Sequence, residues 1–203
     1  MDHQLELPVF PSGAYTVAEA AFVVDADHRF INREIDAHVV APSNSGTGSG
    51  ARLVARSSLL YFAAVRDVRT TLDTGARKDI YRRVLDAVAQ GRPDIEFGAF
   101  RASIQELTMA IQPRLGPVDA LRDAIVVHPD IGGGEPVLKG TRLKVRVLAD
   151  MVRQGVTAEE IHAEFDVPKE FVNLAGLYDR LYPRRGRPPI GKQGVREHVP
   201  FTR

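Results

Sequence analysis

The sequence predicts a mainly α-helical fold with short β-hairpins, built from two helix-turn-helix-like units. Apolar residues recur at helical spacing in several segments, and a Thr-x-x-Glu capping box precedes two of them. Short extended runs broken by glycine and proline lie between the helices. The expected parts are a winged helix-turn-helix over 1–70, a helical linker over 71–125, a trihelical domain over 126–182 and a flexible basic tail over 183–203.

The N-terminal unit begins with a capping box formed by Thr16 and Glu19, which predicts a helix over 17–24. Asp25 follows in the turn, where its tolerance of left-handed backbone angles is useful. A second helix is expected over 27–37 and a third over 58–66. Between them, extended segments at 38–40 and 52–55 are expected to form a β-hairpin wing around the small polar run 42–50.

Two short helices joined by a tight turn match the plan in which the second helix lies in the major groove of DNA. Arginine and asparagine on that helix suit guanine and adenine edges, and arginines on the wing suit phosphates. The residues expected to contact DNA are His28, Arg29, Asn32, Arg33, Arg52 and Arg56. The alternative is that they are solvated helix residues, since Asp25, Asp27, Glu34 and Asp36 oppose the positive field. The register of this unit resembles that of MerR-type regulators and excisionases.

The middle of the chain is expected to be mostly helical. A helix should run from Thr74 or Gly75 to about residue 89, followed by one strand within 95–102. A further helix should start at Ser103, stop near residue 111 because of Pro113 and Pro117, and resume over 115–125.

The C-terminal unit begins with a β-hairpin in which 126–127 and 136–138 flank a glycine-rich turn. Helices are expected over 145–153 and 158–165, the second opened by a Thr157–Glu160 capping box, with a third ending near 181. Because its helices carry more acidic than basic residues, this unit is expected to mediate dimerisation or another protein contact rather than read DNA. Its last helix has a surplus of apolar residues that serves such a contact or simply completes the core: Phe171, Leu174, Leu177, Tyr178 and Leu181.

The run Gly-Glu-Pro-Val-x-Lys-Gly-Thr-Arg over 134–142 resembles the antitoxin-like family known as "domain of unknown function 433". Further matching residues are Pro129, Asp130, Val145, Gly155, Glu159, Glu160, Ile161 and the stretch 183–188. The resemblance implies a DNA-binding antitoxin of the VapB kind, paired with a PIN-like ribonuclease toxin. The protein contact expected of the C-terminal unit is then dimerisation or a contact with this toxin.

The tail, 182–203, carries six Lys and Arg residues against one Glu, whereas the whole chain has a net charge of +1. Such a basic arm needs an acidic partner. Its central motif is Arg184, Arg185, Gly186, Arg187 and Pro188. The motif is similar to an AT-hook that enters a narrow minor groove, or its guanidinium groups could enter the carboxylate-rich active site of the toxin. A merely solubilising tail is the third interpretation.

Composition excludes several classes of protein. The chain has no cysteine, no apolar run of membrane-spanning length and no secretory leader, so a cytoplasmic protein is expected. The pairs His128–Asp130 and His162–Glu164 lack a third ligand at helical spacing. Neither an enzyme nor a bound metal or cofactor is therefore expected.

The function expected from the sequence is a homodimeric antitoxin that neutralises a PIN-like ribonuclease toxin and binds operator DNA to repress its own operon. The alternatives are a stand-alone transcription regulator with an AT-hook-like arm, and a pure inhibitor whose helix-turn-helix units only dimerise.

Overall fold

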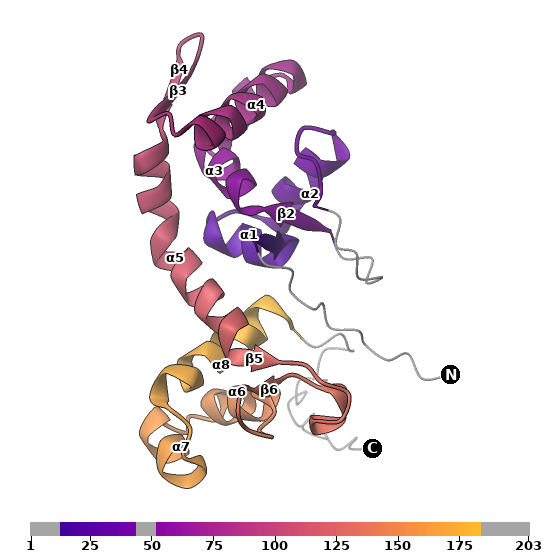
Figure 1. Ribbon diagram of the computed structural model, residues 1–203, viewed down its shortest axis with the longest axis vertical. Coiled ribbons are helices and arrows are strands. Elements are labelled where there is room, and N and C mark those ends of the chain that lie inside the picture. The colour runs from indigo at the N-terminus through magenta and orange to yellow at the C-terminus, as the bar shows by residue number, and fades with distance from the viewer. Residues whose placement is uncertain (1–12, 44–51, 184–203) are drawn as a thin grey trace, which may run out of the picture.

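The computed structural model describes residues 13–43 and 52–183, and these are mainly helical (Figure 1). Three two-stranded antiparallel sheets, β1–β2, β3–β4 and β5–β6, lie among the helices. In chain order the elements are β1 (Ala14–Thr16), α1 (Val17–Val23), α2 (His28–Asp36), β2 (Leu53–Ala55), α3 (Arg56–Val65), α4 (Thr74–Gln90), β3 (Asp94–Phe97), β4 (Phe100–Ser103), α5 (Ile104–Ala124), β5 (Ile125–Val126), β6 (Val137–Leu138), α6 (Val145–Arg153), α7 (Ala158–Phe165) and α8 (Lys169–Leu181).

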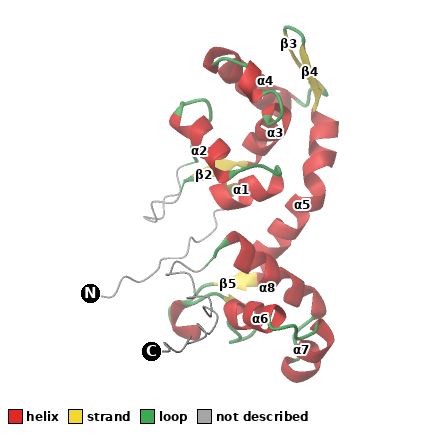
Figure 2. Ribbon diagram, turned by 180° about the vertical axis from the view of Figure 1, so that it is seen from behind, coloured by secondary structure: helices red, strands yellow, loops and turns green. Residues whose placement is uncertain are grey.

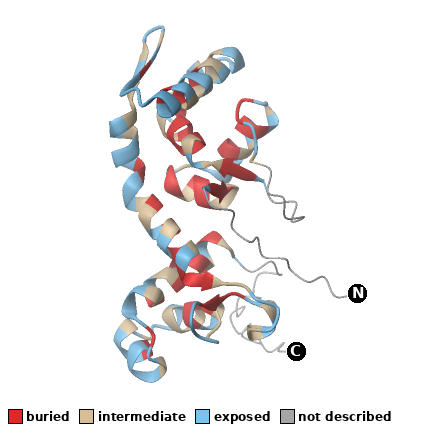
Figure 3. Ribbon diagram, in the orientation of Figure 1, coloured by how far each residue is buried: buried red, intermediate tan, exposed pale blue. Residues whose placement is uncertain are grey.

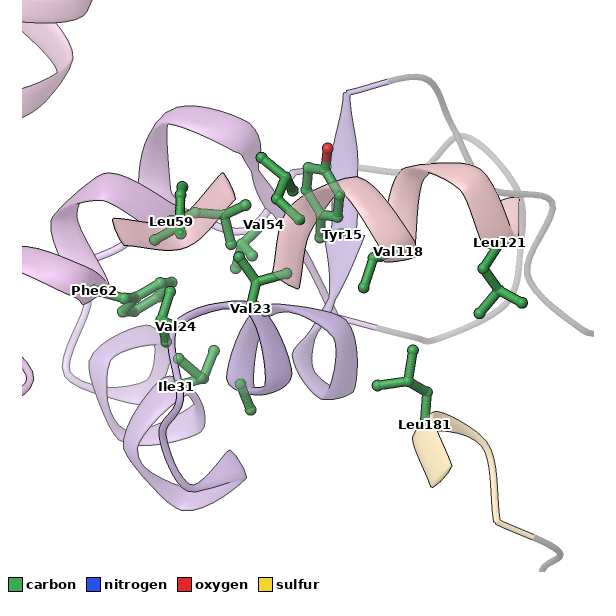
Figure 4. Close-up of a cluster of buried hydrophobic side chains, with 14 of the residues drawn as sticks. Tyr15, Val23, Val24, Ile31, Val54, Leu59, Phe62, Val118, Leu121 and Leu181 are labelled. Carbon is green, nitrogen blue, oxygen red and sulfur yellow. The ribbon is translucent and has the colours of Figure 1, made fainter. Parts of the chain in front are cut away.

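The first two helices form as their local sequence predicts. Thr16 and Glu19 make a reciprocal capping box at the start of α1. Asp25 takes a left-handed backbone conformation with φ of 55° and turns the chain toward α2. Apolar side chains from α1, α2, α3 and the β1–β2 sheet then meet in one core, which Figure 4 shows in part: Tyr15, Val23, Val24, Ile31, Val54, Leu59 and Phe62.

The predicted pairing of the wing is wrong in one respect, because residues 38–40 are not a strand. The amide groups of Val39 and Val40 both donate to the carbonyl of Glu34, so the chain folds back onto the end of α2 and buries both valines. β2 pairs with β1 along its whole length, and an isolated bridge joins Ser43 to Leu53 on the other side. The predicted tip of the wing, beyond residue 43, lies outside the described residues.

The middle of the chain differs from expectation at two places. The single strand expected within 95–102 is a hairpin, because Gly98 adopts a φ of 57° and reverses the chain between β3 and β4. Helix α5 is continuous although it contains Pro113 and Pro117. Pro113 has no N–H to donate to the carbonyl of Met109. Because Met109 and both prolines are exposed, water can form hydrogen bonds with the backbone carbonyls that lack a helical donor. The apolar face of α5 stays buried throughout and outweighs the local penalty: Ile111, Leu115, Val118 and Leu121.

Replacing Pro113 by Ala should therefore stabilise the protein. The substitution restores a backbone N–H inside α5 at an exposed position, and proline is about 3 kcal/mol less favourable than alanine inside a helix. We expect the free energy of unfolding in urea to rise by about 1–3 kcal/mol. The matched control is Gln112→Ala next to it, exposed and without a proline ring, which should change stability by less than about 0.5 kcal/mol. A lower urea midpoint for Pro113→Ala would show that the ring itself is needed in this helix.

The C-terminal unit follows its predicted order closely. Strands β5 and β6 pair antiparallel, and α6 and α7 have the predicted bounds. The capping box of Thr157 and Glu160 is present, Gly155 has a φ of 90°, and Asp166 takes the left-handed position after α7. Helix α8 packs across α6 and α7.

Helix α5 lies along both units, and α8 closes against it (Figures 1 and 2). The segment predicted as a linker contributes to the core, since α4 packs on α3 and α5 contacts α1, α3 and α8. Figure 3 shows buried residues both around α1 and where α5 meets α8. Of the surplus apolar residues of α8, Leu177, Tyr178 and Leu181 are buried in the cluster that runs through both units. This packing favours the interpretation that they complete the core.

Candidate nucleic-acid interface

Helix α2 separates its side chains into two faces. Its inner face is buried against α1, α3 and the turn that follows it: Phe30, Ile31, Glu34 and Ile35. Its outer face, the term used below, is exposed or half-buried: His28, Arg29, Asn32, Arg33 and Asp36. The four residues of this helix that the sequence predicts to contact DNA therefore share the outer face.

Two carboxylates fix α2 in place. The side chain of Asp27 accepts a hydrogen bond from the Arg29 amide at 2.7 Å and caps the helix. On the inner face, Glu34 is 1% exposed and accepts hydrogen bonds from Tyr61 at 2.7 Å and Arg77 at 2.6 Å. Burial and the neighbouring Glu34 carboxylate raise the pKa of Tyr61 well above its usual value. These contacts hold the outer face in a fixed orientation relative to α3 and α4.

Arg52, the residue before β2, contacts the outer face of α2. Its guanidinium donates to Asp36 Oδ1 at 2.6 Å and to Asn32 Oδ1 at 3.2 Å. Both partners of the ion pair are about half exposed, with side-chain exposures of 47% and 59%. An ion pair of this kind contributes at most about 1 kcal/mol, so an incoming phosphate can compete for Arg52.

Arg56 has a different setting from the one predicted for it. Its guanidinium donates to Asp119 Oδ2 at 3.2 Å and to the Tyr15 hydroxyl at 3.3 Å, and neither partner belongs to α2. The Tyr15 hydroxyl itself donates to Asp119 Oδ1 at 2.7 Å. Burial and then Asp119 raise the pKa of Tyr15 to about 12. The structure thus gathers five of the six predicted residues on or beside α2 and places Arg56 between β1 and α5.

The acidic residues that oppose DNA binding in the sequence are already engaged. Asp25 forms an ion pair with Arg114 at 2.5 Å, which lowers the pKa of its carboxyl group. The carboxylates of Asp27, Glu34 and Asp36 are occupied by the contacts given above. Within 13–43 and 52–183, by contrast, no acidic side chain pairs with Arg29 or Arg33. The outer face therefore presents two cations whose neighbouring acids are already engaged.

A second buried carboxylate connects the two ends of the fold. Glu19 is fully buried and accepts hydrogen bonds from the Thr16 amide and the Tyr182 hydroxyl, both at 2.7 Å. The guanidinium of Arg122 lies 3.8 Å away. Burial and the Glu19 carboxylate raise the pKa of Tyr182 far above its usual range. Sequence reasoning assigned Glu19 only to the capping box, because Tyr182 and Arg122 are distant in sequence.

The remaining predicted site residues, Arg184, Arg185, Gly186, Arg187 and Pro188, lie outside the described residues. Within the described part, no three His, Cys, Asp or Glu side chains gather as they would around a metal ion. The candidate pairs have structural partners instead: His128 Nδ1 accepts from the Asp130 amide at 3.2 Å, and His162 Nδ1 lies 2.9 Å from the carbonyl of Val167. No helix of the described part is long and apolar enough to cross a bilayer.

Comparison with known proteins gives a family for part of the chain. Residues 125–178 match the family model "Protein of unknown function (DUF433)". A relative, "Uncharacterized protein y4eO" of Sinorhizobium fredii (strain NBRC 101917 / NGR234), is 28% identical over 181 residues, which cover 84% of this chain and 82% of that protein. Among solved structures, the crystal structure of Rv2018 from Mycobacterium tuberculosis aligns with a TM-score of 0.35 and 15% identity, covering 82% of this chain and 98% of that one. The match confirms, over 125–178, the resemblance of the C-terminal unit to this family of unknown function.

Proposed function

We propose that this protein binds operator DNA through α2 and acts as the antitoxin of a toxin–antitoxin pair. One observation carries the DNA-binding part: the outer face of α2 is held rigidly and presents Arg29 and Arg33 while each nearby carboxylate has another partner. Ion pairs with Arg114, Arg77 and Arg52 thus offset the charges of Asp25, Glu34 and Asp36.

The chemistry of the outer face suits the edges of base pairs. An arginine can donate two hydrogen bonds to guanine, and asparagine can form a matching pair with adenine. Asn32 presently accepts from Arg52. The Arg52 guanidinium has five N–H groups, so it can keep its ion pair with Asp36 and also donate to a phosphate. Arg52 then positions the helix while Arg29, Asn32 and Arg33 read sequence.

A second copy of the chain completes the proposed complex. One short helix reads only a few base pairs, and two copies read half-sites one helical turn apart, about 34 Å. Autorepression follows if those half-sites lie in the promoter of the operon that encodes this protein.

Fluorescence anisotropy tests the DNA-binding part of the proposal. The probe is a labelled duplex from the region upstream of the chain's own gene, and a shuffled duplex of equal length is the control. We expect the upstream duplex to bind at least about a thousandfold more tightly at physiological salt, as is typical of specific recognition. Equal affinity for both duplexes would contradict sequence-specific reading by α2.

The antitoxin part of the proposal is supported by the antitoxin-like resemblance of the C-terminal sequence and by the basic tail that follows it. The proposed partner is a PIN-like ribonuclease whose active site holds metal ions on clustered carboxylates. Arginine pairs bidentately with carboxylate, so Arg184, Arg185 and Arg187 would compete with the metal and stop RNA cleavage.

Co-purification with the product of the adjacent gene tests this partner. The full chain should retain the neighbour and inhibit its ribonuclease activity, while a chain ending at Tyr182 should lose inhibition. The matched control is a full chain in which Lys192 and Arg196, outside the motif, are replaced by Ala, and it should inhibit normally. Equal inhibition by the truncated and full chains would contradict the proposal that the tail enters the active site of the toxin. Weaker DNA binding by the truncated chain would then favour the AT-hook-like alternative.

A further inference from the structure

An open pocket of about 530 Å³ connects α2 to the C-terminal unit. It lies beside the turn between α1 and α2 and is bordered by the end of α8. His28, from the outer face of α2, and Arg180, from α8, line the same pocket. The proposed DNA-binding face and α8 are therefore neighbours on the surface, although 152 positions of sequence separate these two residues.

Arg180 is a cation, and two of the acids near it form ion pairs with other residues. Asp25 pairs with Arg114, and Asp179, the preceding residue in α8, accepts from Arg153 at 2.8 Å. The guanidinium of Arg180 lies over the Phe22 ring at 5.4 Å from its centroid. Among the described residues no carboxylate forms an ion pair with it. Arg180 thus resembles Arg29 and Arg33 in its electrostatic setting.

The end of α8 is fixed relative to α1, so Arg180 has a defined position. The Tyr182 hydroxyl donates to the buried Glu19 at 2.7 Å, and Arg146 donates to the Tyr182 carbonyl at 3.2 Å. Leu181 is buried and lies near Leu121 of α5 (Figure 4). On the other side of Arg180, Asp179 pairs with Arg153. Because the backbone is positioned before and after Arg180, only its own side chain must become ordered when it binds a ligand.

We infer that the DNA-binding surface continues from α2 onto α8, where Arg180 contacts a phosphate of the DNA backbone. The inference rests on the proposed function, since it needs α2 in the major groove. That groove is about 12 Å wide, so a strand of phosphates runs along each side of a helix seated in it. Arg180 lines the same pocket as His28, so we assign it to the phosphates on that side of the helix. The C-terminal unit then contributes affinity without reading sequence.

Arg180→Met tests the inference, because methionine keeps an unbranched stem over Phe22 and removes the charge. Anisotropy titrations use the upstream duplex and the shuffled duplex at several salt concentrations. Both affinities should fall by the same factor, roughly three- to tenfold, and the slope of log K against log salt should decrease by about 1. Arg142→Met is the matched control, since Arg142 is also an exposed arginine of the C-terminal unit but does not line the pocket. It should bind like the wild-type chain.

The outcomes separate the inference from the proposed function. If Arg180→Met keeps the wild-type affinity and salt slope while loss of Arg29 and Arg33 abolishes specific binding, the α8 contact is overturned and recognition by α2 stands. If the wild-type chain binds neither duplex, both are overturned. Matching melting temperatures for Arg180→Met, Arg142→Met and the wild-type chain exclude loss of fold as the cause.

Discussion

Replacing Arg29 and Arg33 together by Ala is expected to abolish specific binding to the upstream duplex. Each bidentate contact between arginine and a base is worth about 1–3 kcal/mol, so losing two should cost about 2–6 kcal/mol of binding free energy. Both side chains are exposed on α2 and neither is among its buried residues, so the fold should be unaffected. Anisotropy titration of the upstream and shuffled duplexes measures the loss of affinity. Affinity for the shuffled duplex should fall only because two charges are removed, whereas affinity for the upstream duplex should fall further.

The matched control is the double variant Arg92→Ala with Arg142→Ala. It removes the same charge from two exposed positions, one after α4 and one after β6, neither of them on the outer face of α2. Retained preference for the upstream duplex is expected. Equal losses in the two double variants would mean that net charge, not the outer face of α2, determines binding.

Replacing Glu19 by Ala is expected to cause the largest loss of stability. The substitution removes the carboxylate that accepts from the Thr16 amide and the Tyr182 hydroxyl and that lies 3.8 Å from Arg122. Removing one partner from a buried charged network costs about 3–5 kcal/mol, because the remaining polar groups stay buried without compensation. Urea unfolding followed by circular dichroism measures the change in the free energy of unfolding.

An exposed glutamate provides the comparison for this variant. Glu164→Ala removes the same carboxylate from α7, where no ion pair with a described residue involves it, and should change stability by less than about 0.5 kcal/mol. Tyr182→Phe should show an intermediate loss of about 1–3 kcal/mol, because it removes one donor and leaves Glu19 with the others. A Glu19→Ala chain as stable as Glu164→Ala would contradict the role of the network.

Local signals in the sequence were sufficient for most helices. Capping boxes at Thr16 and Thr157 and helical apolar spacing predicted α1, α2, α4, α6 and α7 to within about a residue. The errors occur where tertiary contacts override local preference. Proline rules predicted a break near Pro113, but packing of the buried face of α5 keeps the helix continuous. Alternation predicted one strand over 95–102 and missed the reversal at Gly98.

The candidate interface was predictable in part for the same reason. Helical spacing places His28, Arg29, Asn32 and Arg33 on one face, and the structure confirms that they share it. Spacing cannot pair residues across elements, so the contact of Arg56 with Asp119 and the position of Arg180 beside His28 were not foreseen. Nor could it show that Asp25 is paired with Arg114 of a helix more than eighty residues away.

The Glu19–Tyr182 hydrogen bond sets an order of events during synthesis. The two residues are 163 positions apart, so Glu19 leaves the ribosome long before its partner exists. At 5–20 residues per second, the carboxylate waits roughly eight to thirty seconds for the tyrosine. During that time the first two helices can form, but Glu19, which is buried in the finished fold, is still in contact with water. Final closure of the N-terminal unit is therefore among the last steps, and a nascent chain arrested before residue 182 should remain a target for chaperones and proteases.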